Sequence, residues 1–394
     1  RRALVRMRGL RYTERHAKDV SPADLARVDM CWSLSTLGLI DTIRGADFGA
    51  RQLLLALRLG EPGRLARALA IEAIYAAQMS GPGRARRLLA EAARLAEKDH
   101  QDHVLGIIST STGLVEYVFG NYALALEHLE RGHDYFADCI GASWEISVTR
   151  LFELICLYYQ GKLDELARRL PPLLVEAEDR GDLFAATSFR IATQHLVLIA
   201  DGRADDARRN VDQAMARWSQ TGFQMQHRYA LLTHVEIDLS EGKDAEAHDR
   251  IERSWQDVES SMLLRIRQQR IETLSARGRA AIAAGKTTEA ARYARRIVAE
   301  DMPWAVGLGK LITAAVAFAG KHDDAAIADL RDALARLDGC GMALHAAAAR
   351  RRLGRLIGGS EGQELVAAAD AWLAGAGIAN ADGLVRMLAP GFAP

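Results

Sequence analysis

The sequence predicts an all-α protein, a right-handed α-solenoid of about nine helix–turn–helix pairs. Three observations support this. Glycines recur 35 to 43 residues apart, an alanine stands five residues after most of them, and helix-forming residues dominate the 394-residue chain, which has 8 prolines. Each pair in such an array packs only on its neighbours. The expected turn glycines are Gly45, Gly81, Gly120, Gly161, Gly202, Gly242, Gly285, Gly320 and Gly359.

The fullest copy of the pattern is Gly113, Gly120 and Ala125. The middle glycine can end a helix in a left-handed conformation because it has no Cβ atom. The other two small residues let the antiparallel helices approach closely. The trio recurs at Gly38/Gly45/Ala50 and Gly278/Gly285/Ala290 and resembles the tetratricopeptide (TPR) consensus. Since the spacing exceeds the TPR period of about 34 residues, we expect a TPR-like solenoid with long helices.

We expect three regions along the chain. Residues 1–22 are a basic linker, 23–374 the solenoid, and 375–394 a C-terminal cap and tail over the last apolar face. The basic segment is either solvated or docks on an upstream domain, and the first residue, Arg1, suggests a piece of a longer polypeptide. The expected pairs are 23–59, 64–99, 102–138, 143–180, 183–219, 224–260, 263–300, 303–338 and 342–374, followed by a short helix at 382–388.

Composition narrows the range of possible functions and partners of the protein. With 51 basic and 51 acidic residues, the chain has no net charge that would draw it to nucleic acid or an anionic membrane. No apolar run looks long enough to span a bilayer. The four cysteines lack disulfide or metal-ligand spacing, so we expect reduced thiols and a cytoplasmic location. Arginine clusters such as Arg350–Arg352 are expected to form solvated faces and ion pairs.

The sequence predicts no catalytic, cofactor or metal site, and therefore no enzyme. Gly285-Lys286-Thr287 resembles the end of a P-loop, but Ala280 replaces the required first glycine and the preceding segment is helical. His100 and His103 lack further ligands for a metal ion. No nucleophile–base motif is present.

The remaining candidate is the groove formed by the first helix of each pair. TPR geometry places six residues there as partner-binding candidates, with Tyr159 and Phe189 beside them. Aromatic and charged side chains on a concave wall suit capture of a peptide or helix. Alternatively, the aromatic residues pack between adjacent helices. The six candidates are Tyr117, Tyr158, Tyr229, Glu236, Glu272 and Arg279.

Stretches near both ends carry a closer likeness. They are Val28–Ser33, Asp41–Phe48 and Leu53–Arg58 at the start, and Ala369–Leu373, Gly377-Ile378 and Met387–Phe392 at the end. Together they resemble the C-terminal TPR region of bacterial STAND/AAA-ATPase-linked serine/threonine protein kinases. The resemblance implies a sensor or scaffold arm in signal transduction, which binds a protein or peptide and relays this to upstream ATPase and kinase domains. It carries no binding residues over to this chain.

Three functions follow as hypotheses. The first is the non-catalytic protein-interaction and sensor region just described. The second is a receptor whose solenoid groove holds a small ligand or peptide. The third is an autonomous scaffold without an attached enzyme. Kinase and Walker motifs encoded ahead of this chain would separate the first from the third.

Overall fold

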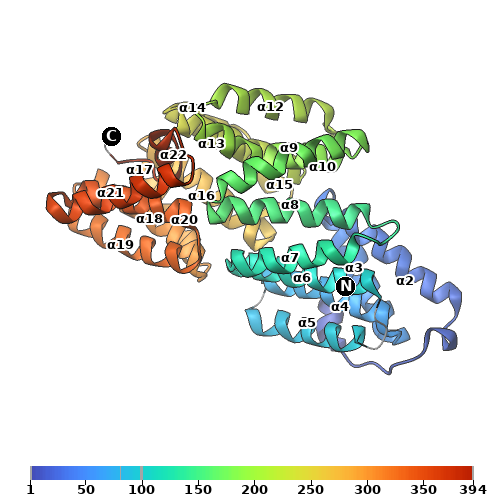
Figure 1. The fold of residues 1–394 in the computed structure, drawn as a ribbon. Helices are drawn as coiled ribbons and strands as arrows, with labels where there is room; N and C mark the ends of the chain where they lie inside the picture. Colours follow the sequence, from blue (N-terminus) through green and yellow to red (C-terminus); the bar gives the residue numbers. More distant parts are fainter. Residues whose placement is uncertain (1, 80, 98–100, 393–394) are drawn as a thin grey trace. The chain divides into compact units, whose positions relative to one another are not determined.

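The computed structural model describes residues 2–79, 81–97 and 101–392, which form helices and connecting turns without any strand (Figure 1). This confirms the all-α prediction. The chain divides into two compact units. Unit 1 consists of Arg1–Phe119 and Leu124–Glu153, and unit 2 of Gly120–Ala123 and Leu154–Pro394.

Unit 1 is a set of antiparallel helices in which α2 packs on α3, and α4 packs on both α5 and α6. Its apolar core draws on every one of these helices. The elements are α1 (Arg2–Arg8), η1 (Ala17–Asp19), α2 (Pro22–Ser35), η2 (Thr36–Leu39), α3 (Thr42–Leu59), α4 (Pro62–Met79), α5 (Pro82–Ala96), α6 (Asp102–Phe119), and the larger part of α7 (Tyr122–Phe136) and of α8 (Ser143–Gln160).

The first turn differs from the prediction. Gly45 lies inside α3, and the chain reverses earlier, over η2. Asp41 fixes the start of α3, because its Oδ1 accepts a hydrogen bond from the Arg44 backbone N–H at 3.0 Å. A Cβ atom on Gly45 would lie 2.3 Å from Gly38 Cα. These two glycines therefore permit close backbone packing, and a capping aspartate rather than Gly45 defines the helix boundary.

Part of the segment expected to be a linker packs against the rest of unit 1. The backbone N–H of Arg15 donates to the Gly60 carbonyl at 2.9 Å, and Arg94 pairs with Glu14 at 2.9 Å. The Tyr12 hydroxyl donates to Glu91, and burial together with this carboxylate raises the pKa of Tyr12 to about 12. The boundaries of the three predicted regions remain a prediction.

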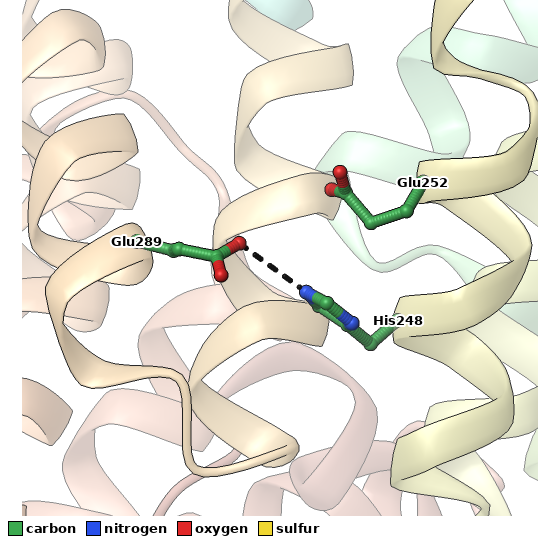
Figure 2. A group of neighbouring side chains, drawn as sticks. All are labelled: His248, Glu252 and Glu289. Atoms are coloured by element: carbon green, nitrogen blue, oxygen red, sulfur yellow. Dashed lines mark hydrogen bonds and ion pairs between the residues drawn. The ribbon is translucent and has the colours of Figure 1, made fainter.

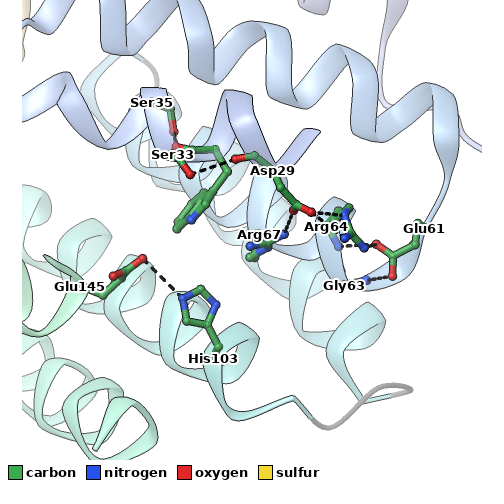
Figure 3. Close-up of polar contacts among 10 residues, drawn as sticks. Asp29, Ser33, Ser35, Glu61, Gly63, Arg64, Arg67, His103 and Glu145 are labelled. Carbon is green, nitrogen blue, oxygen red and sulfur yellow. Dashed lines mark hydrogen bonds and ion pairs between the residues drawn. The ribbon is translucent and has the colours of Figure 1, made fainter. Parts of the chain in front are cut away.

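The stretch Val28–Ser33 lies in α2 and contacts α4 and α6 (Figure 3). Asp29 accepts hydrogen bonds from Arg64 and Arg67, each at 2.6 Å. Arg67 also lies 5.4 Å from the ring centroid of Trp32, which meets His103 edge-on. This part of the N-terminal stretch thus serves packing within unit 1. His100 lies outside the described residues.

Unit 2 repeats helix pairs in two layers. The first helices α11, α13, α16 and α18 contact one another in sequence, and we call them the first-helix layer. Each packs on its partner, α12, α14, α17 or α19. Bounds are α9 (Leu163–Asp179), α10 (Leu183–Phe189), η3 (Arg190–Gln194), α11 (His195–Ala200), α12 (Ala204–Arg217), α13 (Met225–Ser240), α14 (Asp244–Arg253), α15 (Trp255–Ser260), η4 (Leu263–Arg265), α16 (Arg267–Ala283), α17 (Thr287–Val298), α18 (Pro303–Ala319), α19 (Asp323–Gly339), α20 (Ala343–Ile357), α21 (Gly359–Gly375) and α22 (Ala381–Leu388).

Turn glycines in unit 2 mostly behave as predicted. At the α18–α19 turn the left-handed position belongs to Lys321, with φ of 60°, and not to Gly320. Gly161 has a second constraint, since a Cβ atom there would lie 2.8 Å from Trp372 of α21. The turn after α8 therefore packs directly on a much later helix. Positive φ angles occur at Gly120, Gly161, Gly202, Gly242, Gly285 and Gly359.

One described helix, Leu183–Ala200, is long and apolar enough to cross a membrane by length and composition. This corrects the expectation that the chain has no such run. The helix consists of α10, η3 and α11, and 72% of it is buried inside the structure. The core helix of a soluble protein passes the same test, and the burial of Leu183–Ala200 supports its interpretation as a core helix.

Candidate functional site

Glu236 is the centre of a buried ionic cluster in unit 2. Its Oε2 lies 2.8 Å from His195 Nε2, and its Oε1 accepts a hydrogen bond from an Arg279 guanidinium nitrogen at 2.7 Å. The Tyr158 hydroxyl lies 3.4 Å from Oε1. These partners come from α8, α11 and α16, so the cluster joins four helices through one carboxylate.

The Glu236 carboxylate is ionised at neutral pH. Burial by itself raises its pKa, since a charged group loses solvation in the interior. The neighbouring Arg279 and His195 outweigh this effect and lower the pKa of Glu236 to about 2. For the Tyr158 hydroxyl, burial and the Glu236 charge outweigh the opposing effect of Arg279 and raise the pKa well above its usual range. The cluster is thus an ion pair with a neutral phenol beside it.

A second carboxylate, Glu272 on α16, has a similar set of partners. Arg228 donates to its Oε2 at 2.7 Å, and the Tyr159 hydroxyl donates to Oε1 at 2.8 Å. The Arg228 side chain is fully buried and also donates to Thr273 Oγ1 at 2.8 Å. Because Tyr158 and Tyr159 are consecutive, the end of α8 contacts both carboxylates. We call Glu236, Glu272 and these partners the paired-carboxylate network.

An irregular turn positions His195. The helix containing it widens to a π-turn over η3, directly before this residue. A π-turn interrupts the usual hydrogen-bond ladder and occurs frequently at functional sites. Here the Thr233 hydroxyl from α13 donates to the Ile191 carbonyl at 2.6 Å and so bonds a carbonyl within the irregular turn. The π-turn thus leads directly into the residue that contacts Glu236.

The structure brings together four of the six groove candidates, Tyr158, Glu236, Glu272 and Arg279, within the network. Tyr229 packs against the apolar cluster around Ile191 and Val211, and its ring centroid lies 5.5 Å from the Arg228 guanidinium of the network. Tyr117 belongs to unit 1, where it meets Phe152 edge-on with ring centroids 5.3 Å apart. Both aromatic residues thus pack against neighbouring helices. Partner binding by the six candidates remains a prediction.

Sequence reasoning missed His195, Arg228 and His345. The TPR offset pointed to Tyr229, and one residue along a helix turns the side chain by about 100°. Arg228 and Glu236 are eight residues apart on α13, a helical spacing that keeps both on one face. Likewise, His195 precedes the apolar run 196–200 and His345 lies within the apolar run 343–349. Burial together with Arg279 lowers the pKa of His345 to about 3. Polar residues within apolar helical runs were therefore the available signal.

The C-terminal segment, residues 380–392, lies against the first-helix layer. Helix α22 contacts α11, α13, α20 and α21. The Asn380 backbone N–H donates to the Ala200 carbonyl at 2.8 Å, and Arg279 donates to the Met387 carbonyl at 2.8 Å. The apolar side chains of α22 are buried, including Leu384 and Leu388. The segment expected to cap the last apolar face thus also contacts a helix about 180 residues earlier in the sequence.

His248, Glu252 and Glu289 form a cluster with ligand atoms within 4.8 Å of one another (Figure 2). Glu252 already accepts two hydrogen bonds from Arg277, both at 2.6 Å. That guanidinium also lies 3.6 Å from the Trp255 ring centroid. Because a fixed cation neutralises Glu252, the cluster is better explained as an ion-pair and stacking arrangement than as a metal site.

Comparison with known proteins identifies the fold. No family model and no curated protein matches the sequence. A solved structure, a Rap protein complexed with competence and sporulation factor, superimposes with a TM-score of 0.68. The match covers 92% of this chain and 100% of that one, at 12% sequence identity. The chain therefore has a TPR-like α-solenoid fold, as the sequence predicts. At this identity the likeness concerns the fold alone.

Proposed function

We propose that the chain is a non-catalytic binding module whose first-helix layer in unit 2 captures a polypeptide segment of a partner protein. The observation that carries this proposal is the docking of the chain's own C-terminal segment on that layer. TPR-like solenoids offer extended surfaces for such contacts. The Rap protein's complex with competence and sporulation factor is consistent with a binding role.

The contacts to the C-terminal segment recognise backbone. Arg279 donates to the Met387 carbonyl, Arg352 Nε to the Ala389 carbonyl at 3.0 Å, and the backbone of Asn380 pairs with Ala200. Backbone carbonyls are present in every peptide, so the same donors suit another segment. Glu236 holds Arg279 in place, because one guanidinium nitrogen bonds the carboxylate while another faces the segment.

Apolar contacts supply the selectivity of this surface. Leu384, Val385 and Leu388 of α22 are buried, and their spacing places them on one face of the helix. A helix laid into an apolar groove is recognised through anchors about one turn apart, as Leu384 and Leu388 are. We therefore propose a partner segment that is a short amphipathic helix, competing with α22 for the layer.

A labelled synthetic peptide of residues 379–392 tests this directly by fluorescence anisotropy. In the wild-type chain, the tethered segment competes at a millimolar effective concentration and suppresses binding. Asn380→Ala weakens the tether's docking, since Asn380 also donates to the Ile199 carbonyl at 3.2 Å. We expect this variant to bind the peptide about 5–30-fold more tightly than the wild type.

A double variant, Asn380→Ala with Arg279→Lys, tests whether the peptide binds at the first-helix layer. Lysine keeps a positive charge beside Glu236 but loses the planar fork that reaches Met387 as well. Peptide affinity is expected to fall, whereas Arg331→Lys, which alters an exposed pair with Glu361, is expected to leave it unchanged. Failure of the peptide to bind Asn380→Ala, or equal binding after Arg279→Lys, would reject capture by this layer.

The likeness of the two end stretches supports a finer proposal. The module would serve as the sensor arm of a cytoplasmic signalling protein that carries STAND ATPase and serine/threonine kinase domains. Capture of a partner would then be relayed to those domains. Sequencing the coding region ahead of Arg1 tests this, because kinase and Walker motifs are required there. Their absence would leave an autonomous scaffold.

A further inference from the structure

A cavity of about 480 Å³ lies in unit 2 beside the C-terminal segment. Helix α20 forms one wall, and α22 with the residues after it forms another. Val385, Pro390 and Phe392 contribute apolar surface to the lining. This volume falls within the range of sites that hold small organic ligands. The cavity does not include the paired-carboxylate network.

The charged residues of the lining are predominantly basic. Four guanidinium groups face two carboxylates: Arg351, Arg352, Arg355, Arg386, Asp244 and Asp382. Arg351 pairs with Asp382 at 2.5 Å and with Asp370, outside the lining, at 2.7 Å. Even with this third carboxylate included, four positive charges meet three negative charges, which leaves a surplus of one.

Part of this positive charge is buried in the interior. Arg352 is buried, and this burial together with the nearby Arg355, Arg351 and Arg386 lowers its pKa to about 10. Crowded positive charges destabilise one another, so an anion placed among them would relieve the repulsion. The ring of Phe392, which also lines the cavity, lies 5.6 Å from the Arg352 guanidinium.

We propose that this cavity is a binding site for a small, multiply charged anion bearing phosphate or carboxylate groups. Guanidinium groups match both oxyanions with paired hydrogen bonds, and a lining that combines them with an aromatic ring suits an organic anion. Arg355 is the most exposed of the four arginines and Arg386 is half-buried, which makes these two the accessible contacts.

The site also bears on the C-terminal segment. Asp382, Arg386 and Phe392 belong to that segment, so the cavity is complete only when the segment is docked. An anion bound there stabilises the docked form by mass action. Anion binding would consequently oppose entry of a partner segment, although the anion site itself does not depend on the proposed peptide capture.

Isothermal titration calorimetry on the full chain at constant ionic strength tests the site. Pyrophosphate and citrate serve as probes, so that phosphate and carboxylate chemistry are distinguished. We expect saturable binding of at least one probe. Arg355→Gln is expected to weaken it at least fivefold and Arg355→Gln with Arg386→Gln further. Arg350→Gln is the matched control, because Arg350 neighbours the cluster on α20 but lies outside the lining and pairs with Asp338.

The outcomes are decisive in either direction. Binding weakened by the cluster variants and retained within twofold by Arg350→Gln supports the site, and the preferred probe names the anion class. Thermal unfolding of each variant without probe checks that the fold persists; Arg355→Gln is the variant that least disturbs packing. The proposal would be overturned if neither probe bound the wild-type chain saturably. It would also be overturned if Arg355→Gln and the double variant both bound the probe as tightly as the wild type does.

Discussion

The Arg279 guanidinium bonds the carbonyl oxygen of Met387, 108 positions later in the chain, at 2.8 Å. The same side chain holds the Glu236 carboxylate at 2.7 Å, and the two contacts use different nitrogens. One arginine therefore connects a buried anion on α13 to the backbone of the C-terminal segment. The Arg279 guanidinium therefore neutralises Glu236 and, in the same orientation, donates to Met387.

Replacing Arg279 by methionine should destabilise unit 2 substantially. The substitution keeps an unbranched apolar stem but leaves Glu236, which is only 8% exposed, without its main counter-charge. Breaking a buried ion pair from one side costs about 3–5 kcal/mol. Urea unfolding followed by circular dichroism measures the loss. Arg331→Met, which removes an exposed partner of Glu361, should cost less than about 1 kcal/mol.

Equal losses for the two variants would show that Arg279 contributes no more than a surface ion pair. A loss that Glu236→Gln largely reverses in the Arg279→Met background would instead identify the unpaired charge as the cause.

Two turn glycines with the same backbone conformation should respond differently to alanine. Gly120 and Gly285 have φ angles of 83° and 72°. At Gly285 a Cβ atom meets nothing within 4 Å, so alanine pays only the left-handed backbone cost of roughly 1–2 kcal/mol. At Gly120 a Cβ atom would lie 2.6 Å from the Trp304 ring, which adds an overpacking cost of about 1–3 kcal/mol.

Chemical unfolding of the two single variants measures this difference. Because both substitutions restrict the unfolded chain equally, their difference isolates the contact with Trp304. Indistinguishable stabilities would mean that Trp304 shifts freely and that the turn does not constrain its neighbour.

The fold was predictable because the turn signals are local. A glycine at the end of a helix reports on the residues beside it, and the pairs from 102–138 onward follow the expected boundaries closely. Gly45 was misread because small residues serve two purposes. The spacing that marks a turn elsewhere marks close packing against Gly38 here. Asp41, a capping residue next to the true turn, carried the correct signal.

The candidate site was partly predictable for a different reason. Offsets from the turn place Glu236, Glu272 and Arg279 in the groove, where charged side chains are expected to face a partner. In the structure Glu236 pairs with Arg279 and Glu272 with Arg228, because buried charged groups must find partners. The contact between Arg279 and Met387 was not predictable. It depends on how α22 returns to the first-helix layer, which no local pattern in the sequence encodes. The charged cavity escaped prediction similarly, because α20 and the C-terminal segment assemble it jointly.

Removing the cap of α22 should loosen the C-terminal segment selectively. Asn380 Oδ1 accepts from the Gly383 backbone N–H at 3.1 Å, and its Nδ2 donates to the Ile199 carbonyl. Losing an N-cap costs about 1 kcal/mol, and losing the second bond adds to it. We expect amide hydrogen exchange over 384–388 to accelerate about 5–30-fold in Asn380→Ala.

Asp182→Ala is the matched control, because Asp182 caps α10 through the Ala185 backbone N–H at 2.9 Å. It should affect exchange around α10 and leave 384–388 unchanged. Acceleration of both regions in both variants would indicate that unit 2 opens as a whole and that the C-terminal segment has no separate docking equilibrium.

As the pH falls, the protonation linked to His345 should destabilise unit 2 at a higher pH than protonation of the carboxylates does. Burial and the nearby Arg279 lower the folded-state pKa of His345 to about 3, against about 6.5 in an unfolded chain. The unfolded state therefore binds the proton first. The stability that depends on neutral His345 is fully present above pH 6.5 and is lost progressively as the pH falls toward 3, by at most about 1.4 kcal/mol per pH unit.

Glu236 acts in the same direction in a lower window. Its pKa rises from about 2 in the folded state to about 4.5 on unfolding, so its contribution is present above pH 4.5 and disappears below it. The range from pH 6.5 to 5 consequently reports on His345 with little interference from this carboxylate. Burial also lowers the pKa of His227 and His234, which therefore contribute in the same range. His345→Gln, which has no titrating group, should reduce the slope of unfolding free energy against pH in that range without abolishing it. An unchanged slope would show that His345 gains its proton without unfolding the chain.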